Sequence, residues 1–163
     1  MNLKNYKKKL NYNSKEIKYE LVSKLNKLCK NLHEKYDINY GGCCYIAYCI
    51  ARICEYLEFE FNLIVFDDEY DLDEYEELND LPTMSHYAIM LDDSEDGEII
   101  NCEDHWFNHY YKRRYFKVKS RDILKYYLTH EPWNKRYNTK NNSSIRLIIE
   151  DFYYVWTKSL RKK

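Results

Sequence analysis

The 163-residue sequence lacks a long apolar run, an excess of charge of either sign, and any glutamine. A membrane-spanning helix needs about 18 consecutive apolar residues, and no segment approaches that length. The basic residues 1–10 are followed by no apolar stretch, which argues against a secretory signal. The chain has 26 basic and 27 acidic residues, so it is not a globally basic nucleic-acid binder. We therefore expect neither a membrane nor a nucleic acid as partner.

Glycine and proline are also scarce, with three and two residues respectively. Two of the glycines, Gly41 and Gly42, are adjacent and form the one double glycine of the sequence. The length is that of one domain. We expect residues 1–163 to form a single domain, with a basic arm at 1–12 and a basic tail at 158–163.

Cysteine is concentrated in one place, because four of the six cysteines fall within residues 43–54. The segment has the character of a helix, and neighbouring positions on a helix seldom have disulfide geometry. We therefore expect reduced thiols and a cytoplasmic protein. The six residues are Cys29, Cys43, Cys44, Cys49, Cys54 and Cys102.

Hydrophobic periodicity predicts an amphipathic helix over residues 13–36 and a second helix over 43–57. The second segment is rich in small and apolar residues, and only Arg52 and Glu55 in it are charged. Most sides of this helix should therefore be buried. The apolar stripe of the first helix consists of Ile17, Leu21, Leu25, Leu28 and Leu32.

Segments rich in β-branched and aromatic residues predict a small antiparallel sheet, so the expected fold class is α+β. The second and third of these strands should form a hairpin. Ser120 can cap a short helix over 120–128, and a last helix is expected from about residue 147. The expected strands are 59–66, 85–91, 98–102 and 115–119.

Cys43 stands where a reactive thiol is expected, at the start of the second helix. Free N–H groups and the partial positive charge of a helix N-terminus lower the pKa of a thiol and favour the thiolate. His86, at the start of a strand, can accept the thiol proton. Asn101, on the adjacent strand of the hairpin, can orient the imidazole. These three residues form the candidate site.

The order of these features resembles the papain-like and transglutaminase-like cysteine peptidase superfamily. The shared pattern is Gly-Gly-Cys-x-x-x-Ala at the start of a buried helix, then a strand that begins with His, then a polar residue on the next strand. It covers residues 39–104, the catalytic-like core. The resemblance implies a buried Cys-bearing helix packed on a small antiparallel sheet, here with extra helices at both ends. It also implies action on a peptide or amide bond through a thioester, without a cofactor.

On this resemblance Cys43 is the nucleophile, His86 the general base and Asn101 the orienting residue. Asp104 is the alternative orienting residue, and Cys44 is the alternative nucleophile. The implied activity is that of a cysteine hydrolase or acyltransferase with a peptide or protein substrate.

The oxyanion of such a reaction would be held by backbone N–H groups near Gly42 and Cys44, since glycine lets the backbone come close. Papain-like enzymes also carry a Gln before the Cys. Because this chain has no Gln, Asn39 is the candidate donor in its place.

Two other functions compete with the enzyme. Cys102, His105 and His109 have a metal-like spacing, which would suit a zinc-stabilised domain. Alternatively the chain is a non-catalytic interaction protein of phage or effector type on the same fold. Nine acidic residues at 67–80 and six basic residues at 112–121 could steer a charged partner in that case.

Overall fold

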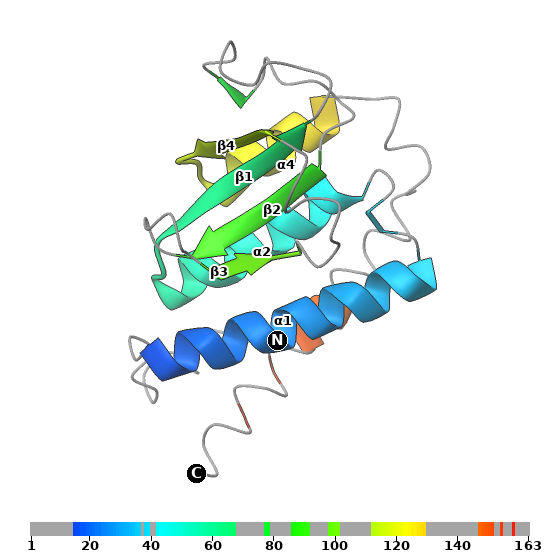
Figure 1. The fold of residues 1–163 in the computed structure, drawn as a ribbon, viewed down its shortest axis with the longest axis vertical. Helices are drawn as coiled ribbons and strands as arrows, with labels where there is room; N and C mark the ends of the chain where they lie inside the picture. The colour runs from blue at the N-terminus through cyan, green and yellow to red at the C-terminus, as the bar shows by residue number, and fades with distance from the viewer. Residues whose placement is uncertain are drawn as a thin grey trace.

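The computed structural model describes residues 15–36, 38–39, 42–67, 77–78, 86–91, 98–101, 112–129, 147–151, 154 and 158. The elements are α1 (Lys15–Tyr36), α2 (Cys43–Leu57), β1 (Phe61–Asp67), β2 (His86–Leu91), β3 (Glu98–Ile100), β4 (Lys112–Phe116) and α4 (Ser120–Thr129). The sheet packs on α2, which also contacts α4, while α1 lies along the edge strand β3 (Figure 1). The predicted α+β class is confirmed.

In the described residues, the strands form one antiparallel sheet with the order β3-β2-β1-β4. β2 lies between β1 and β3, with Phe66 opposite His86 on one side and Ile100 opposite Ile89 on the other. The predicted pairing of the second and third strands is therefore confirmed. The turn between them, residues 92–97, lies outside the described residues.

The last strand lies three residues earlier than the sequence predicted. It was expected at 115–119, whereas β4 is Lys112–Phe116 and pairs with residues 63–67 of β1. After β4 the chain turns into α4, and Lys119 caps that helix. Its carbonyl accepts the N–H of Asp122 at 2.9 Å, and its own N–H donates to the Asp122 carboxylate at 3.2 Å.

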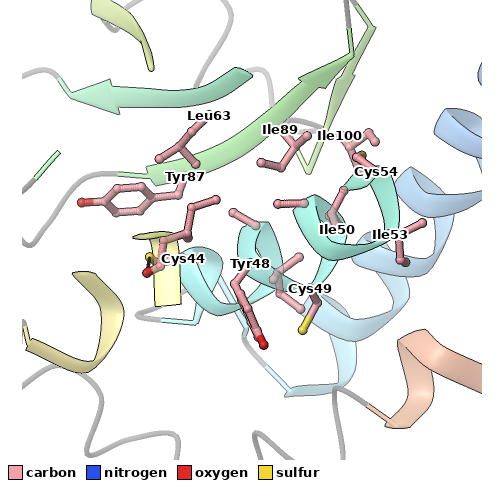
Figure 2. Close-up of a cluster of buried hydrophobic side chains, with 14 of the residues drawn as sticks. Cys44, Tyr48, Cys49, Ile50, Ile53, Cys54, Leu63, Tyr87, Ile89 and Ile100 are labelled. Atoms are coloured by element: carbon pink, nitrogen blue, oxygen red, sulfur yellow. Dashed lines mark hydrogen bonds between the residues drawn. The ribbon is translucent and has the colours of Figure 1, made fainter. Parts of the chain in front are cut away.

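The sheet has apolar side chains on both faces, and all six residues of β2 are buried. The face toward α2 carries the larger cluster, which includes Tyr87 and Ile89 (Figure 2). Successive side chains of a strand point to opposite faces, so the other face receives the alternate residues. This second, smaller cluster consists of Ile64, Phe66, Ala88 and Met90.

The helix α2 is the centre of the fold, with 12 of its 15 residues buried. Its bounds are those predicted. The low charge of the segment indicated a buried helix, and the helix is indeed packed on several sides. Glu58 ends the helix in the left-handed conformation, with φ of 59°, and its N–H meets the carbonyls of Cys54 and Glu55. The first residue of this helix is Cys43, so the core itself fixes the position of that thiol.

The helix α1 presents the predicted stripe to the rest of the protein. Leu21, Leu25 and Leu32 are buried, and Ile17 and Leu28 are partly buried against the same cluster. The stripe thus predicted both the helix and its packing face. Residues 13 and 14 of the predicted helix lie outside the described residues.

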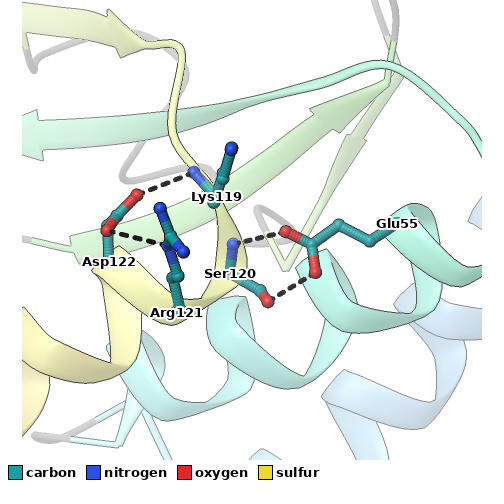
Figure 3. Close-up of polar contacts among 5 residues, drawn as sticks. All are labelled: Glu55, Lys119, Ser120, Arg121 and Asp122. Carbon is teal, nitrogen blue, oxygen red and sulfur yellow. Dashed lines mark hydrogen bonds and ion pairs between the residues drawn. The ribbon is translucent and has the colours of Figure 1, made fainter.

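Glu55 and Ser120 join α2 to α4 (Figure 3). The Glu55 carboxylate accepts the backbone N–H of Ser120 at 2.7 Å and its hydroxyl at 2.6 Å. The sequence predicted Ser120 as the helix cap, and this was wrong. Ser120 is the first residue of α4, and its backbone N–H donates to a carboxylate from another helix.

Removal of the Glu55 carboxylate is expected to weaken this junction. Glu55→Ala and Ser120→Ala should each lower the free energy of unfolding by about 1 kcal/mol, since a hydrogen bond to a charged but exposed group contributes modestly. Urea unfolding of both single variants and the double variant measures the coupling. Losses that simply add would show that the two side chains do not act together.

The C-terminal part of the chain is helical where it is described. Residues 147–151, 154 and 158 are in helix, as predicted from about residue 147, and Ile149 is buried against the core. Within the described part of the chain, no helix has the length and hydropathy that crossing a membrane requires.

Candidate functional site

Cys43 begins α2, directly after Gly42, and its side chain is only 4% exposed. Gly42 donates its N–H to the carbonyl of Ile38 at 2.8 Å and accepts the N–H of Ile46 at 3.1 Å. These bonds fix the entry of the chain into the helix. The first turn contains no acidic residue, so no carboxylate there opposes a negative charge on the sulfur.

The sulfur of Cys43 is surrounded by backbone N–H groups, but burial decides its protonation. Burial raises the pKa of Cys43 from 9.0 to about 11, against the lowering effect of the N–H groups of Tyr87, Cys44 and Cys43 itself. The expected resting thiolate is therefore not what the structure favours, because desolvation of the charge outweighs the helix N-terminus. At neutral pH Cys43 is therefore a neutral thiol in this structure.

His86 begins β2 and is also buried, at 6% exposed. Its Nε2 lies 2.6 Å from the backbone carbonyl of Asn101. A carbonyl oxygen can only accept, so Nε2 carries the proton, and in the neutral imidazole the lone pair is on Nδ1. The ring also packs against Phe66 with centroids 5.9 Å apart. The hydrogen bond thus selects Nδ1 as the basic atom.

Cys43 and His86 lie at the same end of the sheet, but no hydrogen bond joins Nδ1 of His86 to the Cys43 sulfur. The imidazole packs against Phe66, which belongs to the cluster on the face away from α2. Tyr87 follows His86, and its backbone N–H is one of the groups that act on the Cys43 sulfur. The thiol therefore reaches the backbone of β2 one residue beyond His86. The packing of α2 on β2 thus brings two residues that are 43 positions apart in the sequence to the same end of the sheet.

Asn101 directly follows β3 and bonds His86, but with an atom that the sequence did not indicate. Its backbone carbonyl, and not its side-chain amide, accepts from His86. The side-chain Nδ2 instead donates to Oδ1 of Asn39 at 3.1 Å. Asn101 has a φ of 70°, a left-handed conformation that asparagine adopts more readily than most residues. Asn39, the candidate oxyanion donor, is therefore tied to Asn101 through its oxygen.

Asn26 on α1 is a site residue that sequence reasoning missed. Its Nδ2 donates to the carbonyl of Ile99 at 2.9 Å, and its Oδ1 accepts the N–H of Asn101 at 2.8 Å. A signal was present, since Asn26 lies four residues after Val22 and three before Cys29, both of which are buried. A polar amide on the inward face of an amphipathic helix indicates a specific partner.

Cys44 points toward α4. Its sulfur lies 3.9 Å from the carbonyl of Ile123, and burial raises its pKa well above the ordinary value. Nearby, the hydroxyl of Tyr87 donates to that of Tyr126 at 2.8 Å. As the alternative nucleophile, Cys44 therefore has its contacts with the core and not with His86 or Asn101.

The other candidate residues lie outside the described residues: Asp104, Cys102, His105 and His109. Among the residues that are described, no three His, Cys, Asp or Glu side chains gather as metal ligands. The five described cysteines are buried, and none of them is in a disulfide.

A hollow of about 600 Å³ lies where β1 begins and the chain enters α4. Its walls include Phe61 and Val118, with Lys117, Lys119 and Arg121 from the basic segment. β1 and β2 are antiparallel, so this hollow is at the opposite end of the sheet from His86. It is separate from the candidate site.

Comparison with known proteins leaves this site without a family context. No protein-family model matches the chain, and neither a curated protein nor a solved structure matches it. The resemblance of the Cys, His and Asn pattern is therefore a hypothesis that has to be judged on the geometry above.

Proposed function

We propose that this protein is a cysteine-dependent hydrolase or acyltransferase that acts on a peptide or amide bond, with Cys43 as nucleophile and His86 as base. One observation carries the proposal. The thiol lies at a helix N-terminus, beside the backbone N–H that follows His86, and His86 is held by Asn101 in the tautomer that leaves a basic Nδ1. The finer assignment, a papain-like fold with a peptide or protein substrate, belongs to the same proposal.

The chemistry begins from a neutral pair. In the resting structure Nδ1 of His86 makes no hydrogen bond to the Cys43 sulfur, so the mechanism requires the two atoms to approach when the substrate binds. The proton of Cys43 then passes to Nδ1 as the sulfur bonds to the carbonyl carbon, and backbone N–H groups at Cys43 and Cys44 stabilise the oxyanion. The C–N bond then breaks, and the amine leaves with the proton from His86. Water or a second amine attacks the thioester, gives a proton to His86, and releases the sulfur, which recovers its proton.

Opening of the site is part of this mechanism. In the closed structure burial is the largest influence on Cys43 and raises its pKa. Contact with solvent or a polar substrate removes that influence and leaves three N–H groups that lower the pKa. The substrate thus has to reach a thiol that the resting fold keeps neutral. The described cysteines, which are in no disulfide, also fit a cytoplasmic setting, which we propose with the same function.

The burial of Cys43 also favours a second function, a non-catalytic interaction protein on the same fold. A thiol that is 4% exposed, with a pKa raised to about 11, is what a structural cysteine looks like. The two functions differ in whether Cys43 can form a thioester.

Acylation by p-nitrophenyl acetate tests this without knowledge of the substrate. The sulfur displaces p-nitrophenolate, and an acetyl thioester forms that water hydrolyses. We expect an acetyl group on Cys43 by peptide mass spectrometry. The initial burst of p-nitrophenolate release should be lost in Cys43→Ser and retained in Cys44→Ser. Acetylation of Cys44 in place of Cys43 would move the nucleophile by one residue. Absence of a thioester on either cysteine would support the interaction protein.

A further inference from the structure

The outer edge of β3 is where α1 contributes to the candidate site. β3 is the end strand of the sheet, so its outward backbone groups have no strand to pair with in the described sheet. The carbonyl of Ile99 and the N–H of Asn101 both face α1, and the single side chain of Asn26 bonds both of them. A further strand paired with β3 would form hydrogen bonds to these two groups. Here the side chain of Asn26 forms them instead.

The carbonyl of Asn101 does not point in the direction that it would have if β3 continued through this residue. In an extended strand the N–H and C=O of one residue point to the same side. The N–H of Asn101 faces Asn26 on α1, yet its C=O meets Nε2 of His86 on β2. The left-handed φ of 70° at Asn101 accounts for this turn of the carbonyl.

We propose that Asn26 is a positioning residue of the Cys43–His86 site, because it clamps Asn101 in the conformation that presents the carbonyl to His86. This inference rests on the proposed function. The left-handed region is disfavoured for residues other than glycine, so the turn at Asn101 needs contacts that hold it. Asn26 binds the backbone immediately before the turn and the N–H at the turn. Asn39 binds the side chain of Asn101 from the segment before Cys43.

The clamp determines which nitrogen of His86 is the base. With the carbonyl in place, the Nε2–H tautomer is stabilised and the lone pair stays on Nδ1. Without it, both tautomers would be populated, and a fraction of the molecules would carry the lone pair on the wrong nitrogen. Asn26 would thus act on the reaction through Asn101 and His86, with no contact to the substrate.

Imidazole ¹⁵N–¹H spectra of the full chain measure the tautomer of His86 directly, with assignment from His86→Gln. We expect the Nε2–H form in the wild type and a mixture of tautomers in Asn26→Ala. Acetylation of Cys43 should slow roughly 10- to 100-fold in that variant, as expected for a displaced catalytic group. Asn31 is exposed on the same helix, so Asn31→Ala is the matched control and should change neither result.

A second substitution separates positioning from a loss of packing. Glycine adopts the left-handed conformation without steric cost, so Asn101→Gly in the Asn26→Ala background should restore the Nε2–H tautomer. Asn26→Leu, of similar volume, replaces Asn26→Ala if that variant does not fold. An unchanged His86 tautomer in a folded Asn26 variant overturns the inference, as does a failure of Asn101→Gly to restore it. If the His86 tautomer changes in the Asn26 variants but Cys43 of the wild type is never acetylated, the clamp is supported and the proposed function is overturned.

Discussion

His86→Ala is expected to slow the acetylation of Cys43 by roughly 100- to 10,000-fold, the usual contribution of a general base. The reason is the protonation of the thiol. A Cys43 with a pKa raised by burial to about 11 has almost no thiolate at neutral pH, so the attack needs an acceptor for the proton.

Added imidazole provides the control for this substitution. It should restore part of the rate in His86→Ala and none in His86→Ala combined with Cys43→Ser, since the second variant lacks the nucleophile. Circular dichroism shows whether the fold survives. A folded His86→Ala variant that reacts as fast as the wild type would remove His86 from the mechanism.

The second large effect is a loss of stability in alkali. The pKa of Cys43 is about 11 in the folded protein against an ordinary 9.0, so between these values the unfolded chain releases a proton that the folded chain keeps. Stability from this group is complete below about pH 9 and falls as pH rises, by about 2 kcal/mol at pH 11. Burial likewise raises the pKa of Cys44, Cys54 and Tyr87, so these groups add to the loss.

Urea unfolding between pH 7.5 and 10.5 measures this dependence, and Cys43→Ser isolates the share of one thiol. The hydroxyl of serine does not ionise in this range, so the variant should lose less stability per pH unit than the wild type above about pH 9. The same slope in both proteins would show that Cys43 ionises as easily in the folded chain as in the unfolded one.

Local patterns in the sequence predicted the elements that depend on local composition. The bounds of α2 followed from its low charge, and the stripe on α1 followed from its spacing of three and four residues. The positions of Cys43 and His86 at the starts of a helix and a strand were also predicted. These features depend on residues close together in the chain.

The features that sequence reasoning missed depend on contacts between distant residues. The register of β4 is set by its pairing with β1, and the role of Ser120 is set by Glu55, 65 residues away. Asn26 binds Asn101 across 75 positions. His86 bonds the backbone carbonyl of Asn101 because of the φ angle at Asn101, which no residue type dictates. The raised pKa of Cys43 has the same origin, because burial is a property of the assembled fold.

The two outer strands of the sheet have a consequence for how copies of this chain meet one another. An exposed strand edge can recruit another chain by hydrogen bonding and so start aggregation. Here β3 has only three residues and its outer backbone is bonded by Asn26, while β4 carries the cations Arg113 and Arg114. Like charges would repel if two such β4 strands came together. The sheet is therefore protected against growth at both ends, by a side-chain amide at one and by charge at the other.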